Sequence, residues 1–249
     1  MGKIFVIANW KMNPKTFKEA SELFESVKKA VKKSGDIKVI ICPPALWLKE
    51  FNPGANMNLS LGAQNCHWEV SGAYTGELSS QMLADAGAEY VIVGHSERRN
   101  YMGESDEVVN LKIKAALRAK LRPILCVGER AGEEMNLVVE SQLTKDLAGL
   151  SVGQMKEIIV AYEPVWAIST EGGRSCSPDD ALSAALFIRK TLTKLYSRFL
   201  ADKTPIIYGG SVHDGNEDGY IRQARMNGVL VGGASLEAEE FVRIVQNIK

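Results

Sequence analysis

The stretch Ile158-Ile159-Val160-Ala161, followed directly by Tyr162-Glu163-Pro164, shows the pattern from which the whole chain is built. It is a short apolar run without the alternation of polar and apolar residues that is typical of a half-exposed strand. Such a run indicates a strand buried on both faces, as in a parallel sheet. Glu163 follows the run and would therefore lie at the carboxyl end of that strand.

The same pattern recurs along the chain, so that eight runs occupy 249 residues, roughly one run per 31 residues. This spacing fits a strand followed by a crossover helix. The other seven runs are Ile4 to Ala8, Val39 to Cys42, Leu59 to Ala63, Tyr90 to Val93, Pro123 to Val127, Pro205 to Ile207 and Val229 to Val231. Eight such units form either a closed barrel or an open doubly wound sheet, and their number favours the α/β class with one (β/α)₈ barrel.

Two further features favour a single barrel domain over residues 1–249. An open sheet that binds a dinucleotide needs a G-x-G-x-x-G turn after its first strand, whereas residues 8–11 read Ala-Asn-Trp-Lys. No linker divides the chain, since the Gly- and Ser-rich stretch 169–177 lies between a strand and its helix. We therefore expect parallel strands surrounded by outer helices.

Apolar residues three and four positions apart predict a helix over 179–199 with one core-facing stripe. The stripe consists of Leu182, Ala185, Leu186, Leu192, Leu195, Tyr196 and Phe199. Ser177 and Pro178 suit the N-cap and the first turn of this helix. Ser235 is predicted to open the last helix in a similar way.

The composition limits the classes of partner. The 30 basic and 30 acidic residues give a net charge of zero, which argues against nucleic acid or a membrane surface but allows a local basic pocket. No apolar stretch approaches the roughly 20 residues that span a bilayer. The four scattered cysteines and three histidines predict no metal site. Scattered cysteines in a sequence without a secretory signal are typical of reduced thiols in a cytoplasmic protein.

Polar residues and glycines end several of the apolar runs. In an α/β barrel the active site lies at the carboxyl ends of the strands, so these residues would converge on one mouth. They are Asn9, Lys11, His95, Glu163, Gly209-Gly210-Ser211 and Gly232-Gly233. Each alone has an ordinary explanation, such as a rim charge, a satisfied core histidine or a tight turn. Their occurrence at the same end of different strands favours a catalytic site.

The residue types in this set suggest one chemistry. The glycine-rich turns after the last two strands are where many barrels hold a phosphate through backbone N–H groups. Glu163 could act as a general base beside that phosphate. His95 opens a helix, whose dipole favours a neutral imidazole, and Lys11 could stabilise an oxyanion. Together they indicate proton abstraction next to a carbonyl, through an enediolate.

Five motifs then resemble those of the triosephosphate isomerase family, in the family's order and across essentially the whole chain. They are Ala8-Asn9-Trp10-Lys11-Met12-Asn13, Gly94-His95-Ser96-Glu97-Arg98-Arg99, Ala161-Tyr162-Glu163-Pro164-Val165-Trp166-Ala167-Ile168, Tyr208-Gly209-Gly210-Ser211-Val212 and Leu230-Val231-Gly232-Gly233-Ala234-Ser235. The resemblance implies interconversion of dihydroxyacetone phosphate and D-glyceraldehyde 3-phosphate in glycolysis and gluconeogenesis. It also implies that no cofactor and no metal take part.

The resemblance assigns roles residue by residue. It implies that Glu163 is the base and His95 the electrophile, that Asn9 and Lys11 bind substrate, and that Glu97 is a carboxylate of the site behind Lys11. The remaining roles form three groups: the apolar cover of the base (Ile168, Leu230), the phosphate contacts (Ser169, Ser211, Gly232, Gly233), and the lid's front hinge and latch (Pro164, Val165, Trp166, Tyr208).

The lid departs from the family pattern in two ways. Ser169 stands where the family usually has glycine, and the chain from Glu163 to Pro178 is two residues longer than expected. The front hinge is intact, and so is Ala167-Ile168, which precedes Ser169. We expect the Ser169 amide still to contact the phosphate and the lid still to close.

Two other functions remain as alternatives. An aldolase that forms a Schiff base needs a desolvated lysine inside the barrel, and the apolar runs of strands five to eight contain none. The second alternative is a catalytically impaired phosphosugar-binding barrel whose altered lid has abolished turnover. The presence of Glu163, His95 and Lys11 argues against it.

Residues 65–79 form a long loop after the third strand, with Trp68, Tyr74 and Thr75 along it. An extended loop that carries aromatic residues often marks an interface. The resemblance implies a homodimer in which this loop, with Thr75, enters the neighbouring subunit beside Asn9, Lys11 and His95.

Overall fold

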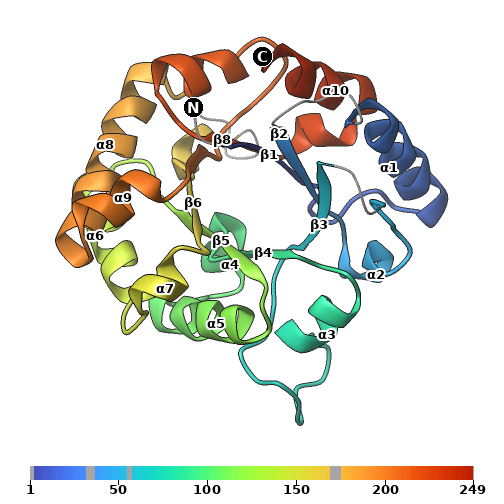
Figure 1. The fold of residues 1–249 in the computed structure, drawn as a ribbon, viewed down its shortest axis with the longest axis horizontal. Coiled ribbons are helices and arrows are strands. Elements are labelled where there is room, and N and C mark those ends of the chain that lie inside the picture. Colours follow the sequence, from blue (N-terminus) through green and yellow to red (C-terminus); the bar gives the residue numbers. More distant parts are fainter. Residues whose placement is uncertain (1–2, 32–36, 55–57, 169–174, 249) are drawn as a thin grey trace.

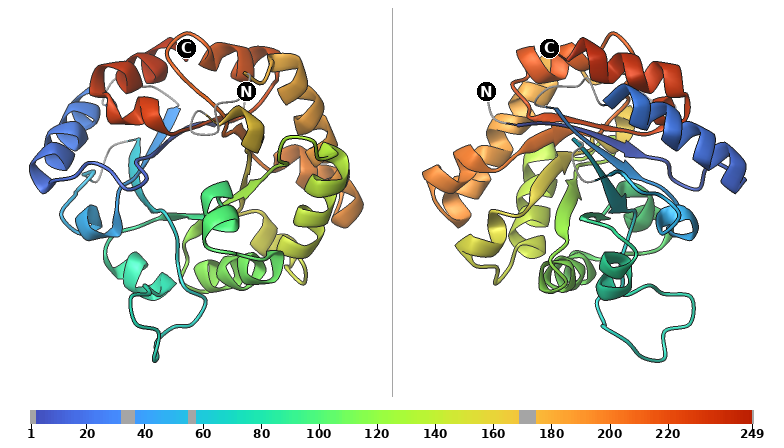
Figure 2. Two further views of the ribbon diagram at one scale, coloured as in Figure 1. Left: turned by 180° about the vertical axis from the view of Figure 1, so that it is seen from behind. Right: turned by 45° about the vertical axis from the view of Figure 1, so that its right-hand side comes forward.

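The computed structural model describes residues 3–31, 37–54, 58–168 and 175–248. Eight parallel strands form a closed barrel in sequence order, from β1 to β8. Helices surround the barrel on its outside (Figure 1), and the two further views agree with this arrangement (Figure 2). The predicted (β/α)₈ barrel is confirmed.

The strands coincide closely with the predicted apolar runs. Their bounds are β1 Ile4–Asn9, β2 Ile37–Cys42, β3 Leu59–Ala63, β4 Tyr90–Val93, β5 Arg122–Val127, β6 Ile159–Tyr162, β7 Ile206–Tyr208 and β8 Gly228–Val231. The barrel closes where β1 pairs with β8, from Phe5 opposite Gly228 to Ala8 opposite Val231. Because all the strands are parallel, the residues that follow each strand lie at the same end of the barrel.

Helices lie between successive strands, and η4 and α10 follow the last strand, β8. The α-helices are α1 Phe17–Val31, α2 Ala45–Leu48, α3 Ser80–Asp85, α4 Ser96–Tyr101, α5 Asp106–Arg118, α6 Met135–Asp146, α7 Val152–Met155, α8 Pro178–Leu195, α9 Arg198–Lys203 and α10 Ala238–Asn247. Among the described residues, two 3₁₀-helices, η1 Val165–Ala167 and η4 Gly233–Leu236, and one π-helix, η3 Gly219–Gln223, follow the strands.

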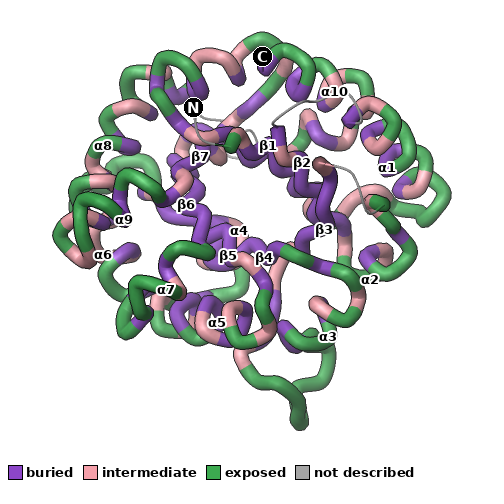
Figure 3. The backbone as a smooth tube through the Cα atoms, in the orientation of Figure 1, coloured by how far each residue is buried: buried purple, intermediate pink, exposed green. Residues whose placement is uncertain are grey.

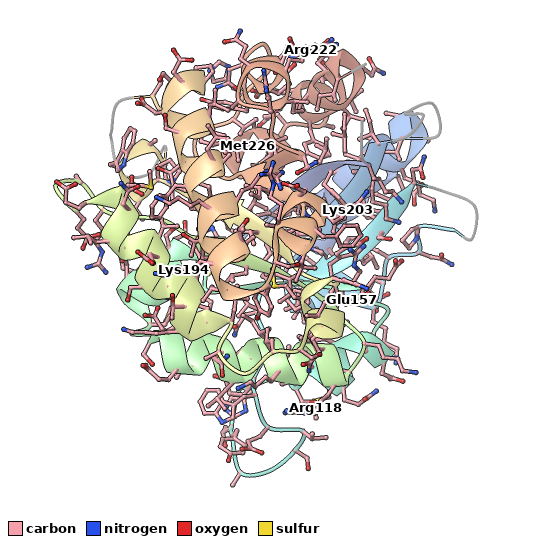
Figure 4. The ribbon with its side chains drawn as sticks, turned by 60° about the vertical axis from the view of Figure 1, so that its left-hand side comes forward. Arg118, Glu157, Lys194, Lys203, Arg222 and Met226 are labelled. Carbon is pink, nitrogen blue, oxygen red and sulfur yellow. The ribbon has the colours of Figure 1, made fainter. Side chains whose placement is uncertain are left out.

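The predicted helix over 179–199 is two helices in the structure. Ser177 caps α8 as expected, through a capping box with Asp180. However, α8 ends at Leu195, and the side chain of Ser197 accepts from the Leu200 N–H and so starts α9. Phe199, predicted to face the core, is 70% exposed on α9, and Leu186 is 59% exposed on α8. Figure 4 views this side of the barrel, with Lys194 on α8 and Lys203 at the end of α9.

The predicted start of the last helix was also wrong. Ser235 lies in η4, where its hydroxyl donates to the Gly232 carbonyl at 2.7 Å. The helix α10 begins three residues later, at Ala238, with Glu237 at its N-cap position. The serine therefore stabilises the turn that follows β8 instead of capping the helix, because its side chain bonds backward along the chain.

Buried residues follow the strands and the sides of the helices that face them (Figure 3), and they form two clusters. One cluster fills the barrel interior and contains Phe5, Ile7, Tyr90, Ile92, Ile124, Ile159 and Ile207 among others. The larger cluster lies between the strands and the helices. The four cysteines are buried: Cys42 and Cys126 belong to the interior cluster, and Cys66 and Cys176 to the outer one. Within the described residues, no helix has the length and apolar character needed to cross a membrane.

Candidate active site

The predicted site residues meet at the carboxyl ends of the strands. A cavity of about 200 Å³, which we call the mouth cavity, is lined there by Asn9, Lys11, His95, Glu163, Ile168, Gly209, Gly210, Ser211, Leu230, Gly232 and Gly233 among others. Glu97 lies beside it through its ion pair with Lys11. Ser169 falls outside the described residues. Thr75 does not line the mouth cavity and is exposed in the loop 65–79.

Glu163 follows β6 and is held in place through both its backbone and its carboxylate. Its N–H donates to the Val127 carbonyl at 2.8 Å. Its Oε2 accepts from the Ser96 N–H at 3.1 Å, and its Oε1 lies 3.3 Å from His95 Nε2. The residue is only 2% exposed. The carboxylate is thereby held at the wall of the mouth cavity, where it can act as a general base.

Gly209 provides space for this carboxylate. A Cβ at Gly209 would lie 2.8 Å from Glu163 Cγ, closer than side-chain carbons approach. The Gly209 N–H also donates to the Tyr162 carbonyl at 2.8 Å, which joins the ends of β6 and β7. The absence of a side chain at Gly209 therefore leaves room for the Glu163 side chain, in addition to allowing the turn after β7.

His95 occupies the N-cap of α4, as the sequence predicted. Its Nδ1 accepts from the Glu97 N–H at 3.2 Å, so this nitrogen carries no proton in this arrangement. The proton of the neutral ring then lies on Nε2, which faces Glu163 and the mouth cavity. A neutral imidazole with its N–H in this position can donate a hydrogen bond to a substrate oxygen.

Lys11 is fixed at both its backbone and its ammonium group. Its φ of 53° lies in the left-handed region, which is strained for a residue with a side chain. Two hydrogen bonds stabilise this strained backbone conformation: Lys11 N–H donates to Asn9 Oδ1 at 3.1 Å, and Gln64 Nε2 donates to the Lys11 carbonyl at 2.8 Å. Lys11 Nζ contacts Glu97 Oε1 at 2.5 Å. The positive charge is thereby held at the mouth cavity.

The turns after β7 and β8 present backbone amides to the same cavity. A Cβ at Gly210 would lie 2.2 Å from the Tyr208 hydroxyl, so only glycine fits beside that ring. Gly233 begins the 3₁₀-helix η4, whose first amides have no partner within the helix. Such a pair of turns is suited to bind an anion.

The segment after Glu163 is tied to the barrel by a buried carboxylate, Glu129. The Val165 N–H donates to the Glu129 carbonyl at 2.9 Å, and Trp166 Nε1 donates to Glu129 Oε1 at 2.6 Å. Tyr162 also donates its hydroxyl to this carboxylate. Pro164 precedes the 3₁₀-helix η1, and Ile168 follows it and lines the mouth cavity together with Leu230.

Tyr208, at the end of β7, is fully buried and stacks on Tyr220, with ring centroids 3.7 Å apart and planes at 14°. Burial raises the pKa of the Tyr208 phenol well above its usual value. The Tyr220 hydroxyl donates to the Cys176 carbonyl at 2.9 Å. The π-helix η3, which carries Tyr220, thus connects β7 to the chain just before α8.

Replacing Tyr220 by Phe should lower the free energy of unfolding by about 1 kcal/mol, because the buried carbonyl of Cys176 loses its donor. Tyr220→Leu should cost about 1 kcal/mol more, since the stack on Tyr208 is also lost. Urea denaturation of the three proteins measures both steps. Equal stabilities of the Phe variant and the wild type would show that the hydrogen bond contributes nothing.

Sequence reasoning missed three residues of this site. Gln64 follows β3 and holds the Lys11 carbonyl, and Glu129 fixes Trp166. Gly128, directly after β5, approaches the Glu163 backbone so closely that a Cβ would lie 2.0 Å from the Glu163 carbonyl oxygen. All three follow an apolar run, which was the available signal, and Gly128 and Glu129 stand beside the charged Arg130 after β5.

Comparison with known proteins agrees with this geometry. The family model described as triosephosphate isomerase matches residues 4–248. A triosephosphate isomerase of Carboxydothermus hydrogenoformans is 48% identical and covers 99% of both chains, and one of Endomicrobium trichonymphae is 46% identical over 100% of both. A crystal structure of triosephosphate isomerase from Bartonella henselae is 36% identical, has a TM-score of 0.86, and covers 98% of this chain and 99% of its own. The chain belongs to the triosephosphate isomerase family.

Proposed function

We propose that this chain is an aldose–ketose isomerase that interconverts dihydroxyacetone phosphate and D-glyceraldehyde 3-phosphate through an enediolate. The observation that carries the proposal is the mouth cavity of about 200 Å³, around which a buried carboxylate, an imidazole and an ammonium group converge beside two glycine turns. Family membership supports the same reaction.

In this proposal the side chains divide the work. Glu163 takes the proton from the carbon next to the carbonyl and returns it to the neighbouring carbon. His95 donates its Nε2 proton as a hydrogen bond to the oxygen that becomes negative, and Lys11 stabilises that charge. Asn9 and Glu97 act through Lys11, since Asn9 bonds its N–H and Glu97 its ammonium group.

The remaining lining residues bind the phosphate and exclude water. The amides near Ser211, Gly232 and Gly233 are proposed to hold the phosphate, and Ile168 with Leu230 covers the base. Pro164, Val165 and Trp166 would act as the front hinge of a lid, with Tyr208 as its latch. Ser169 was predicted to add a further amide; it lies outside the described residues.

We infer that the reaction needs neither metal nor cofactor, because the base, the electrophile and the anion-binding groups are all supplied by the chain. We further propose a cytoplasmic enzyme of glycolysis and gluconeogenesis that acts as one domain over residues 1–249 and binds no nucleic acid. The balanced charge of 30 basic and 30 acidic residues is consistent with a small anionic substrate bound in a local pocket.

An assay with D-glyceraldehyde 3-phosphate, coupled to reduction of the ketose product, tests the reaction directly. Steady turnover would support the isomerase. Binding of a phosphate-bearing inhibitor without turnover would identify an impaired phosphosugar-binding barrel instead. Loss of activity after borohydride treatment with substrate would point to a Schiff base, which the proposed mechanism lacks.

We propose that the functional unit is a homodimer. Residues 65–79 project from the barrel as a finger (Figures 1 and 2), and every residue from 69 to 78, including Thr75, is exposed. The ring of His67 lies 4.0 Å from that of Trp68 and 4.3 Å from that of Tyr74, which gives the finger a defined shape.

A second cavity could receive this finger from another copy of the chain. It has a volume of about 470 Å³ and is lined by Asn9, Lys11, His95 and Glu97, and also by residues 76–78 of the same copy's finger. The exposed apolar residues Met12, Tyr101 and Met102 line it too, and a single copy leaves them in water. A docked finger would therefore cover the outer face of the catalytic lysine and histidine.

Shortening the finger by removing residues 69–77 should give monomers whose activity is at least about tenfold lower, because Lys11 and His95 lose their support. Sedimentation velocity at micromolar concentration measures the mass, and the isomerase assay measures the activity. The intact chain should sediment as a dimer. A fully active monomer of the intact chain would contradict the proposal.

A further inference from the structure

A separate cavity of about 120 Å³ lies behind Glu163, on the side away from the substrate. We call it the rear cavity. It is bounded by the residues that follow β4, β5 and β6 and by the first half of α6, and is lined by Gly94, Ser96, Arg99, Asn100, Cys126, Val127, Gly128, Arg130, Glu133, Val138, Gln142, Glu163 and Val165. Among the described residues, Glu163 alone lines both this cavity and the mouth cavity.

The rear cavity leads from the base to the surface. At its inner end lie the buried residues Ser96, Cys126 and Glu163. At its outer end lie Arg130 and Glu133, both exposed. Between the two ends the lining combines three polar side chains, Arg99, Asn100 and Gln142, with three valines and two glycines, so polar groups are present along the path. The carboxylate thus has one face toward the substrate and another toward a channel that reaches solvent.

Two buried polar atoms at the inner end need a partner. Within the part of the chain that the structure describes, Ser96 Oγ and Glu163 Oε1 make no hydrogen bond. Glu163 Oε1 lies 3.3 Å from His95 Nε2, and the Cys126 thiol is a further neighbour of the Glu163 carboxylate. Buried hydroxyl and carboxylate oxygens are almost always paired, with protein or with ordered water. A polar cavity needs only about 10–15 Å³ to hold one water, so the rear cavity has room for several.

We propose that the rear cavity holds ordered water bound to Ser96 Oγ and Glu163, and that this water is the route by which the proton on Glu163 exchanges with solvent during turnover. The inference rests on the proposed function, since it concerns the proton that the base removes from the substrate. The mouth cavity, lined by Ile168 and Leu230, reaches the base from the substrate side. In this proposal Ile168 and Leu230 exclude water there during turnover, so that exchange proceeds through the rear.

The proton balance of this step is simple. After abstraction, the Glu163 carboxylic acid gives its proton to a water of the rear cavity and receives a proton from the same water chain. No bond other than O–H forms or breaks, and the net charge of the site is unchanged. In D₂O, each exchange replaces the substrate-derived proton by a deuteron, which Glu163 then delivers to carbon. The deuterium content of the product reports how often exchange precedes return.

The first test changes the width of the cavity at Val138, a lining residue on α6 that touches neither substrate nor base in the proposed mechanism. Val138→Phe should narrow the cavity and lower the deuterated fraction of product in D₂O by about threefold or more, with kcat/KM within about twofold of wild type. Val138→Ile should give a smaller decrease. Val152→Phe, at an exposed position on α7, is the matched control and should change neither quantity.

Mass spectrometry of the product measures the deuterated fraction, and thermal melts confirm that each variant is folded. If Val138→Phe does not fold, Val138→Ile carries the test. A folded and active Val138 variant with an unchanged deuterated fraction would overturn the exchange route.

A second test does not depend on activity. A high-resolution crystal structure of the unmodified protein should show water within hydrogen-bond distance of both Ser96 Oγ and the Glu163 carboxylate. A dry rear cavity would overturn the inference even if the isomerase is active. Ordered water in a protein that proves to have no isomerase activity would instead refute the proposed function and leave the water site in place.

Discussion

Replacing Glu163 by Gln should lower kcat by a factor of about 10²–10⁴, which is the usual contribution of a positioned general base. The amide has the shape of the carboxylate but cannot take up a proton. The fold should remain intact, because the Glu163 N–H still donates to the Val127 carbonyl and the amide oxygen can still accept from the Ser96 N–H. Steady-state kinetics and a thermal melt of the variant test both parts.

Glu157→Gln is a suitable control for this experiment. Glu157 is also a glutamate, but it is exposed, pairs with Arg122 at the start of β5, and lies on the outer surface labelled in Figure 4. Its substitution should leave kcat unchanged. A Glu163→Gln variant within threefold of the wild-type rate would remove Glu163 from the role of base.

Gly128→Ala should lower kcat/KM by about 10²-fold, although Gly128 touches no substrate in the proposed mechanism. A Cβ at this position would lie 2.0 Å from the Glu163 carbonyl oxygen and 2.5 Å from the carbonyl carbon. The collision is with backbone and cannot be relieved by rotating a side chain, so the end of β6 must move. Displacement of a catalytic group by about 1 Å can cost 10²-fold in rate. The added volume should also lower the free energy of unfolding by about 1–3 kcal/mol.

The matched control is Gly153→Ala on α7, where the nearest atom to a new Cβ is Ser151 Oγ at 3.8 Å. This substitution should leave activity unchanged and stability equal or slightly higher. Kinetics and urea denaturation compare the two variants. If Gly128→Ala had wild-type activity, the close approach of β5 to the base would have no bearing on catalysis.

The barrel could be predicted because strands buried on both faces leave continuous apolar runs in the sequence. The division of the predicted helix 179–199 could not, because its apolar spacing continues through the break. Ser197 supplies a new N-cap there, and a serine in the middle of a periodic pattern does not by itself indicate a second helix. Ser235 shows the same difficulty, since the direction in which its hydroxyl bonds depends on the turn after β8.

The site was predictable where chemistry and topology coincide. Glu163, His95 and Lys11 carry reactive groups and follow apolar runs, so the parallel arrangement of the strands brings them to one end. The residues that hold them were not predictable. Gln64 contacts a carbonyl 53 positions away in the sequence, and Glu129 bonds an indole 37 positions away. Gly128 matters only because two strands approach each other more closely than a side chain allows.

Because all four cysteines are buried, their labelling by thiol reagents can report how the barrel opens. Thiol reagents attack the thiolate, and burial raises the pKa of Cys42, Cys66 and Cys126, so these thiols should stay inert until the structure around them separates. Two cysteines lie inside the barrel and two lie beneath the helices, so the labelling rate of each pair reports when its layer opens. Labelling that reaches Cys66 and Cys176 before Cys42 and Cys126 would mean that helices detach from an intact ring of strands; simultaneous labelling would mean that the ring itself breaks.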